Sequence, residues 1–399
     1  MRKLHGRMRH YPWGSRTHLA ELTGRQAPSA EPEAEIWYGA HPAEPCALGD
    51  VADGEQSLAD AIQADPAGQL GDRVARQFGS ELPFLLKLLA AGEPLSLQAH
   101  PSAAQAREGY ARENALGMAI DDPKRNYKDP RHKPELLVAL TRFEALAGFR
   151  DPKQTLQQFQ RDGLDQLLPE TMLLHDENLR GLVQRWLSMP VDAVARRVAG
   201  VRELRHVPGA ALAERYPQDP GVLIALLLNH IVLEPGEGLF IPAGVLHAHV
   251  GGLGVEIMAN SDNVLRGGLT TKHVDVDELL EVTDFEPTPR ERLVVRGDER
   301  PTSVDYPLSA EEFELGMYRL PAGVARSETR ASGPKILLCV AGKAEVHAGE
   351  SRERLVPGEA VWLAADETDV RIHAHEDNTT VFCASVPDKL VTHVSRGRP

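Results

Sequence analysis

The chain has 399 residues, a length that favours two or three domains over one hydrophobic core. Its composition, 42% hydrophobic and 26% charged, is that of an ordinary folded protein. The net charge of −14 argues against nucleic acid or an anionic membrane as a general partner, so an anionic ligand would need a local group of cations.

The cysteines and the apolar runs predict a cytoplasmic protein. Cys46, Cys339 and Cys383 have unrelated neighbours and form no CxxC, which argues against a disulfide framework and a thiolate metal site. The basic stretch MRKLHGRMRHYPWG is followed by no apolar core, so it does not read as a secretory signal. The longest apolar run, 222–228, is too short to span a bilayer.

The first 145 residues predict a β domain. Short apolar runs alternate with Pro, Gly and Asp, and strands are expected in 34–42 (AEIWYGAHP) and, with turns, in 82–101 (LPFLLKLLAAGEPLSLQAHP). A further strand is expected in 132–140 (HKPELLVAL), because Pro134 disfavours helix for Lys133.

Residues 150–229 predict a helical block inserted into that β domain. An apolar run from Val222 predicts a helix ending near Asn229, and strand character returns in 230–244 (HIVLEPGEGLFIPAG). The apolar residues that recur near helical spacing are Leu156, Phe159, Leu164, Leu167 and Leu168, and then Leu179, Leu182, Val183, Trp186 and Leu187.

The last part of the chain predicts a second β domain. A stretch rich in Pro and charge, 284–307, reads as a linker or crossover, and turn signals recur at about 8–12 residues after it. Segments 233–250 and 355–372 share L-x-P-G-E before an apolar strand, which suggests two related β-sandwiches. His247 of the first segment aligns with Asp369 of the second, so only the first keeps the imidazole.

Three segments carry candidate metal ligands. Gln98 and His100 lie two apart on a predicted strand and so share a face. Gly92 precedes them by the spacing of the first half-motif of the cupins, small metal-holding β-barrels, although a histidine is usual at position 98. The pattern Gly236-(x5)-Pro242-x-Gly244-x2-His247 resembles the second cupin half-motif.

Glu135 is the third candidate partner. Strand alternation puts Lys133 and Glu135 on one face and His132 on the other. Taken alone, each such polar residue is more often a satisfied structural group than a ligand. Together, two imidazoles, one carboxylate and one amide oxygen suit Zn²⁺.

Seven stretches carry a sharper resemblance, over nearly the whole chain, to the type I mannose-6-phosphate isomerase family. That resemblance implies a zinc-dependent aldose–ketose isomerase that interconverts D-mannose 6-phosphate and D-fructose 6-phosphate through a cis-enediol(ate), which would feed mannose and GDP-mannose metabolism. It implies one Zn²⁺ per chain, with Gln98, His100, Glu135 and His247 as ligands. The stretches are 11–14 (YPWG), 34–42, 82–89, 96–101, 127–136 (YKDPRHKPEL), 240–250 (FIPAGVLHAHV) and 255–276.

The same resemblance implies a domain plan. A catalytic cupin domain of β-sandwich or jelly-roll type would comprise 1–149 with 230–283, and a helical domain 150–229. A cupin-like domain without metal ligands would comprise 284–399. The partner would be a small sugar phosphate, with neither nucleic acid nor membrane; the oligomeric state stays open, and a monomer is compatible with the sequence.

The resemblance also implies roles at the site. Arg266 would stabilise enediolate charge and Lys133 would act as an acid or base. His132 is a candidate for opening the sugar ring, although alternation points it away from Glu135. The candidates for binding substrate are Glu256 as a carboxylate, Ser96, Lys87 and Lys272 for the phosphate, and Trp13 under the sugar.

Three positions depart from the family pattern: His249 stands where tyrosine is common, Thr271 where proline is usual and Arg131 where asparagine is usual. His249 would either contact substrate or add an imidazole near the metal. Two other functions compete with the isomerase, namely an oxidative metal cupin and a sugar-phosphate-binding regulator without turnover. Gln98 disfavours the first, because redox sites more often hold three histidines and a carboxylate.

Overall fold

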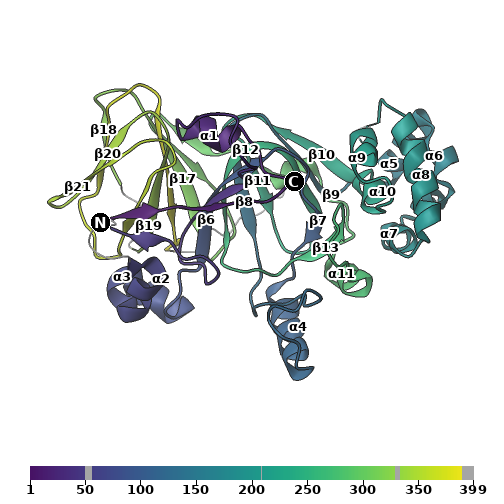
Figure 1. Ribbon diagram of the computed structural model, residues 1–399, viewed down its shortest axis with the longest axis horizontal. Coiled ribbons are helices and arrows are strands. Elements are labelled where there is room, and N and C mark those ends of the chain that lie inside the picture. The colour runs from purple at the N-terminus through teal and green to yellow at the C-terminus, as the bar shows by residue number, and fades with distance from the viewer. Residues whose placement is uncertain (50–55, 208, 329–332, 389–399) are drawn as a thin grey trace, which may run out of the picture.

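The computed structural model describes residues 1–49, 56–207, 209–328 and 333–388. Large β-sheets dominate the molecule, and helices gather mainly at one end of it (Figure 1). The strands of the last third of the chain form the opposite end, and the strands of residues 84–268 lie between the two (Figure 1). The fold therefore combines extensive sheets with a separate group of helices.

The central sheet is organised around one long strand, β12 (His247–Ala259). Its second half pairs with β6 and β8, and its first half pairs with β7 and β9. Gly252 lies between the halves with φ of +125°, and a Cβ there would come 2.8 Å from the carbonyl oxygen of Arg142. Glycine thus lets β12 pass from one group of partners to the other.

The other strands of this sheet form one path and two branches. The path runs β14-β11-β8-β12-β6-β3-β2, while β9 with β10 and β7 with β13 branch from it. Their bounds are β2 Arg7–Arg9, β3 Glu35–Tyr38, β6 Phe84–Ala91, β7 Leu97–Ala99, β8 Glu135–Ala139, β9 Phe143–Phe149, β10 Leu228–Leu233, β11 Gly238–Ile241, β13 Leu265–Gly268 and β14 Val294–Val295. Strands therefore form in all three stretches of the first 145 residues where the sequence predicts them.

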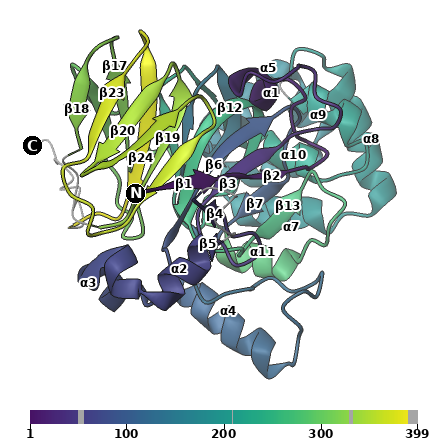
Figure 2. The ribbon, with the colours of Figure 1, turned by 60° about the vertical axis from the view of Figure 1, so that its left-hand side comes forward.

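The C-terminal strands form a nine-stranded and a four-stranded sheet, ordered β15-β16-β17-β24-β19-β22-β1-β4-β5 and β18-β23-β20-β21. The first includes three strands from the beginning of the chain, β1 (Arg2–His5), β4 (Ala47–Leu48) and β5 (Gln56–Ser57). Figure 2 shows β1 beside the yellow-green C-terminal strands. One continuous sheet thus contains strands from both the predicted catalytic domain and the predicted last domain. Residues 389–399 of the predicted last domain lie outside the described residues.

These C-terminal strands have the following bounds: β15 Asp298–Arg300, β16 Ser303–Tyr306, β17 Glu314–Leu320, β18 Ala325–Ser327, β19 Lys335–Ala341, β20 Ala344–Ala348, β21 Ser351–Leu355, β22 Ala360–Leu363, β23 Arg371–Ala374 and β24 Thr379–Ser385. Tyr318, Val346 and Ile372 belong to the buried cluster between the two sheets. The C-terminal strands therefore have an apolar core of their own.

The helical block forms where the apolar periodicity predicts it. Its helices are α5 (Pro152–Asp162), α6 (Leu164–Leu167), α7 (Leu179–Leu187), α8 (Val191–Glu203), α9 (Gly209–Arg215) and α10 (Gly221–Ala225), with a 3₁₀ helix over Pro169–Asp176. Asp151 caps α5 by accepting a hydrogen bond from the Gln154 N–H, and Gly163 ends that helix in the left-handed region. The helix predicted from Val222 to near Asn229 is shorter, because β10 begins at Leu228.

Several helices were not predicted. Four lie in the first 145 residues, namely α1 (His18–Leu22), α2 (Leu58–Ala64), α3 (Pro66–Phe78) and α4 (Ala103–Ala115). Helix α11 (Val276–Val282) ends just before the predicted linker, and α12 (Arg290–Leu293) lies within it. Among the described helices, none combines the length and apolarity that a membrane span requires. Helix α4 stands out from the sheets (Figure 2).

Candidate metal centre

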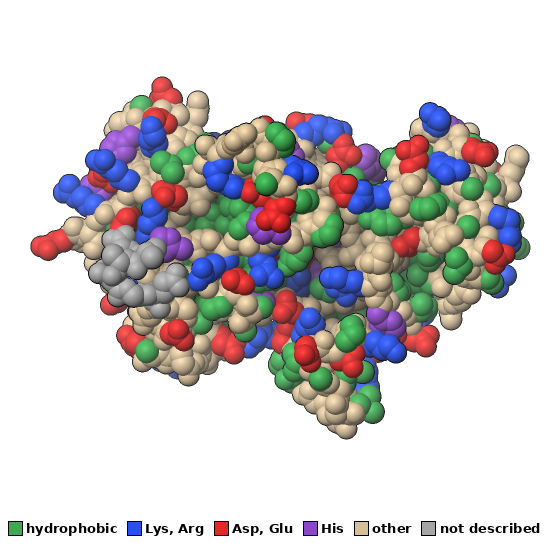
Figure 3. Space-filling view, viewed as in Figure 1, with side chains coloured by type: hydrophobic (Ala, Val, Ile, Leu, Met, Phe, Trp, Pro, Cys, Tyr) green, Lys and Arg blue, Asp and Glu red, His purple; other side chains and the backbone are tan. Residues whose placement is uncertain are grey.

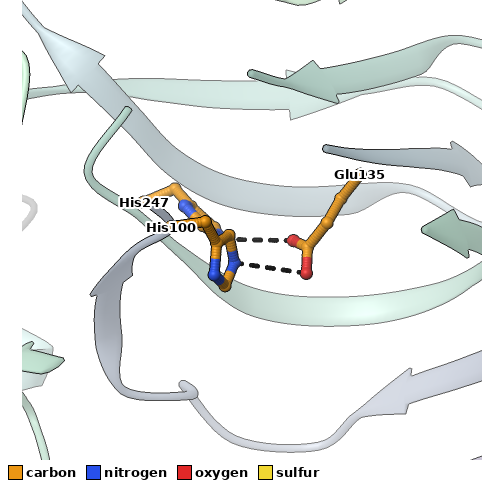
Figure 4. Close-up of side chains that lie close together, drawn as sticks. All are labelled: His100, Glu135 and His247. Carbon is orange, nitrogen blue, oxygen red and sulfur yellow. Dashed lines mark ion pairs between the residues drawn. The ribbon is translucent and has the colours of Figure 1, made fainter. Parts of the chain in front are cut away.

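His100, Glu135 and His247 converge from three different strands. His100 follows β7, Glu135 begins β8 and His247 begins β12. The Nε2 atom of His100 lies 3.2 Å from Glu135 Oε1, and that of His247 lies 3.4 Å from Glu135 Oε2 (Figure 4). All three side chains are buried, and one donor atom of each lies within 4.8 Å of the others.

The other nitrogen of each imidazole is fixed by the backbone. His100 Nδ1 donates to the carbonyl oxygen of Asn263 at 2.8 Å, and His247 Nδ1 donates to that of Val245 at 3.0 Å. Because a carbonyl can only accept, both Nε2 atoms are left with a lone pair aimed at the centre. This arrangement is the one that metal-binding histidines generally have.

Polar atoms at the centre lack hydrogen-bond partners, as expected of a site built for a cation. His100 Nε2 and Glu135 Oε2 are buried and form no hydrogen bond. Burial lowers the pKa of His100 to about 4, against the opposite effect of Glu135, so the imidazole is neutral and able to coordinate. Two imidazole nitrogens and a carboxylate, with Gln98 beside them, fit the donor set that Zn²⁺ prefers.

Lys133 shares the face of Glu135, as the strand alternation predicts. Its Nζ lies 2.9 Å from Glu135 Oε1, and both side chains are buried. Burial alone would raise the pKa of Glu135, but Lys133 and the neighbouring histidines reverse that effect and hold it well below its usual range. The carboxylate is therefore ionised and can bind a cation.

A second buried charge group adjoins the centre. Lys87 Nζ lies 3.4 Å from Glu35 Oε1, 3.3 Å from Glu256 Oε2 and 5.3 Å from the centre of a Trp37 ring. Burial would lower the pKa of Lys87, but the two carboxylates outweigh burial and raise it. Burial raises the pKa of Glu256 to about 7 although Lys87 opposes this, with Glu135 adding to the increase. A phosphate at Lys87 would have to compete with two carboxylates.

His249 lies between these two groups. Its Nε2 is 3.5 Å from Glu256 Oε1, and its ring meets that of Phe143 edge to face at 5.4 Å. Both ring nitrogens are buried and have no hydrogen-bond partner. One donor atom each of His249, Glu135 and Glu256 also lie within 4.8 Å of one another. The sequence departure at 249 therefore puts an unsatisfied imidazole next to the centre.

A group of positive charges lies beside the metal centre and consists of Arg266, Lys272 and Lys128. Arg266 in β13 is the cross-strand partner of Gln98 in β7. Burial lowers the pKa of Lys272, and the positive charges of Arg266 and Lys128 lower it further. Lys128 belongs to a motif singled out in the sequence but was not chosen as a site residue. Such a group is the local positive focus that a phosphate needs in an acidic chain.

Trp13 and Ser96 lie on the loops that lead to the centre. Trp13 is partly exposed and stacks on Tyr11 with ring centroids 5.6 Å apart. Its carbonyl oxygen accepts hydrogen bonds from the backbone N–H groups of Gly92 and Glu93. Ser96 is half-buried just before β7. Among the described residues, no hydrogen bond or ring contact joins either side chain to the three converging ligands.

His132 points elsewhere, as alternation predicts. Its Nε2 lies 2.6 Å from Glu312 Oε1, and both residues line a cavity of about 550 Å³ that includes none of the three converging ligands. The hydrogen bond that His132 donates to Glu312 raises the pKa of His132 against the effect of burial. The structure therefore does not bring His132 to the centre.

Two residues that support the site were missed in the sequence. Glu35 holds Lys87, and Trp37 Nε1 donates to Glu35 Oε2 at 2.7 Å. Asn263 accepts from His100, and its side chain also donates to the carbonyl oxygens of Asp129 and Arg131. Glu35 and Asn263 both lie in stretches that carry the family resemblance. Their contacts, however, depend on distant segments that come together only in the fold.

Known proteins resemble the chain over nearly its whole length. A family model described as phosphomannose isomerase type I, catalytic domain, matches residues 1–152. The chain is 38% identical to the mannose-6-phosphate isomerase of Shigella flexneri over 389 residues, which cover 94% of this chain and 97% of the relative. It is 30% identical to mannose-6-phosphate isomerase 1 of Arabidopsis thaliana, with 94% of this chain and 92% of the relative covered.

Solved structures agree with these relatives. A crystal structure of mannose 6-phosphate isomerase bound with zinc and yttrium superposes with a TM-score of 0.88 at 35% identity, covering 97% of this chain and 99% of that chain. A holo, zinc-bound crystal structure of mannose 6-phosphate isomerase matches with the same TM-score, 0.88, and the same 35% identity and coverage of 97% and 99%.

Proposed function

Because the chain belongs to the mannose-6-phosphate isomerase family, we propose that it interconverts D-mannose 6-phosphate and D-fructose 6-phosphate. The observation that carries this proposal is the buried trio of His100, Glu135 and His247. One possible ligand atom of each lies within 4.8 Å of the others, and His100 Nε2 and Glu135 Oε2 have no hydrogen-bond partner. In our proposal these residues and Gln98 hold one Zn²⁺ per chain. The reaction would supply or consume the mannose phosphate used in mannose and GDP-mannose metabolism.

The bound zinc would orient the sugar oxygens and polarise the carbonyl. The reaction itself moves a proton from C2 to C1, while the oxygen on C1 gains a proton and that on C2 loses one, by way of a cis-enediolate. Lys133 is our candidate for the proton transfer, because its Nζ is buried 2.9 Å from a ligand carboxylate and would therefore lie close to a sugar bound at the zinc.

Arg266 is the candidate for stabilising the enediolate oxygens. It is half-buried, and its cross-strand partner Gln98 belongs to the proposed ligand set. A guanidinium fixed by a strand offers planar donors to a developing negative charge without reorganising first. Glu256 and His249 would line the sugar, because both are buried next to Glu135.

The phosphate would be bound by Lys272 with Ser96, and Lys128 supports this position by its charge. In this proposal Lys87 holds Glu35 and Glu256 in place besides any contact with substrate. Trp13 under the sugar and ring opening by His132 stay predictions. For His132, substrate would have to compete with Glu312.

The domain plan is also part of the proposal. We infer a catalytic cupin-type domain of 1–149 with 230–283, a helical domain of 150–229 and a cupin-like domain from 284 onward. Two features support it: a separate apolar cluster for the C-terminal strands and the clustering of helices at one end. The cytoplasmic location stays a prediction; it rests on the pattern of three cysteines, all of which are buried.

An assay of the isomerase with metal removed and restored tests the function. The zinc-loaded protein is expected to form fructose 6-phosphate from mannose 6-phosphate, to lose this activity to a chelator and to regain it with Zn²⁺. Oxygen uptake with a sugar substrate would favour an oxidative cupin instead. Tight binding of mannose 6-phosphate without turnover by the zinc-loaded protein would favour a regulator.

A further inference from the structure

A cavity of about 660 Å³ lies between the helical block and the strands β9 and β10. Leu146 and Leu228 line it from the strands, and Phe159 and Leu212 line it from α5 and α9. Figure 3 shows hydrophobic side chains at this junction between the central strands and the helices on the right. The volume lies within the range of pockets that hold small organic molecules.

The cavity lies behind the metal centre, on the opposite face of the same strands. In the pairing of β9 with β12, Ala248 is opposite Leu146, while His247 is opposite Ala147. Since neighbouring residues of a strand face opposite sides, Leu146 and Val250 face the cavity whereas His247 and His249 face the centre. A ligand in the cavity would therefore contact the strands that hold these imidazoles.

Arg150 supplies a charge that the cavity does not neutralise. Its guanidinium donates through Nη2 to the carbonyl oxygen of Leu226, and its Nε is buried without a hydrogen-bond partner. Among the described residues, no carboxylate forms an ion pair with it; the nearby Asp162 instead accepts from Gln158 at 2.8 Å. A partly buried guanidinium without an anion is costly, and a bound anion would offset that cost.

Two other charged groups that line the cavity, Glu144 and Arg215, already have partners. Glu144 Oε2 lies 3.3 Å from His230 Nε2, and Arg215 pairs with Glu93. The exposed side chain of Arg205 lies at the lining and adds positive charge. Arg150 is thus the cation best placed to receive an anionic group from a ligand that enters the apolar space.

We propose that this cavity binds a small amphipathic anion, with its carboxylate or phosphate on Arg150 and an acyl or aromatic body between Phe159, Leu212 and Leu146. The two kinds of acid share the same contact with a guanidinium. The apolar lining selects against free sugar phosphates, whose hydroxyl groups would lose their hydrogen bonds to water there. The site is separate from the proposed zinc site and does not depend on the isomerase reaction.

Calorimetric titration of the full, zinc-loaded chain tests the proposal, with octanoate, octyl phosphate and 1-octanol as probes. We expect one saturable site per chain for at least one of the two acids. The acid that binds with the higher affinity identifies the head group that the site prefers. Arg150→Met should lower the affinity for that acid by at least about tenfold and leave the affinity for octanol unchanged, because only the charged contact is removed. Arg196→Met, on an exposed residue of α8 outside the cavity, is the matched control.

Ala211→Trp provides a second variant that keeps Arg150. Ala211 is exposed on α9 and lines the cavity, so an indole there narrows the space with little risk to the core. This change should weaken the binding of octanoate, octyl phosphate and octanol alike. Absence of saturable binding by both acids would overturn the proposal. So would an affinity for the acids that is equal in the parent chain and in either variant.

Discussion

Gln98 and His247 are direct cross-strand partners in β7 and β12, and their Nε2 atoms lie 3.4 Å apart. The amide thus reaches the nitrogen of His247 that faces the proposed metal, and a half-turn of the amide brings Oε1 to the same place. Gln98→Ala should therefore weaken zinc binding about 10- to 100-fold, because one of four donors is lost while three remain. Competition with a chromogenic chelator measures this change.

Two controls make the result specific. Gln98→His restores a donor of the kind usual at this position in the cupin motif, so its zinc affinity should stay within about tenfold of the parent chain. Gln69→Ala removes an amide of α3 that accepts a hydrogen bond from Trp362 of β22, and it should leave zinc binding unchanged. If Gln98→Ala kept full affinity, Gln98 would not be a ligand.

His247→Ala should lose zinc and isomerase activity together. His247 supplies one of the two imidazole nitrogens of the trio, and its backbone contact with Val245 fixes the direction of that nitrogen. His249→Tyr, which introduces the residue common in the family, should keep one zinc per chain. Metal content by elemental analysis separates the two variants. A His247→Ala protein with a full zinc content would mean that His249 can replace the lost ligand.

Strand alternation and turn motifs are local patterns, which explains why the trio could be predicted. Gln98 with His100, and Lys133 with Glu135, share faces by the two-residue period of a strand, and the structure brings both pairs to one place. The contact of Lys87 with Glu35 and Glu256 is different in kind. It depends on β6 lying between β3 and β12, an order that no local pattern specifies.

The missed helix α4 shows another limit of local patterns. Its buried residues are Ala106, Gly109 and Glu113, which provide no apolar stripe at helical spacing. The signal that was present is the capping box of Ser102 and Gln105, which the structure contains. In the same way, β1 is placed by pairing with β22, more than 350 residues later in the chain. Such pairings arise from the packing of whole sheets.

Arg266→Ala should keep zinc and the fold but lower kcat about 10²- to 10³-fold, as expected when a donor to a developing oxyanion is removed. Steady-state kinetics on a sample of known zinc content measures the effect. Arg180→Ala, at an exposed pair with Glu281, is the control and should leave kcat unchanged. A rise in KM with an unchanged kcat would show instead that Arg266 binds the ground state, for example through the phosphate.

Lys87→Met should lower the free energy of unfolding by about 3–5 kcal/mol, because Glu35 and Glu256 would both lose their buried cation. Adding Glu35→Gln should recover part of the loss, since the amide still accepts from Trp37 but carries no charge. Lys3→Met breaks a partly exposed pair with Glu359 and should cost about 1 kcal/mol or less. Equal costs for the two lysine variants in urea unfolding would contradict a buried charge group.

The pair of His132 and Glu312 should stabilise the protein more at acidic than at alkaline pH. The pKa of His132 is raised in the folded chain above its ordinary value of about 6.5. A raised pKa means that the folded state holds the proton more tightly. The stabilisation is therefore complete below pH of about 6.5 and is lost as the pH rises through the higher folded value.

Glu312→Gln should thus lower the free energy of unfolding by about 1 kcal/mol or less at pH 6, since the pair is partly exposed, and by almost nothing at pH 9. Urea unfolding of both proteins at the two pH values gives this difference, in which contributions from other titrating groups cancel. Glu311→Gln is the control, because Glu311 acts on His132 only through its charge and Arg107 opposes it. A difference that is the same at both pH values, or larger at pH 9, would show that Glu312 does not stabilise the protonated imidazole.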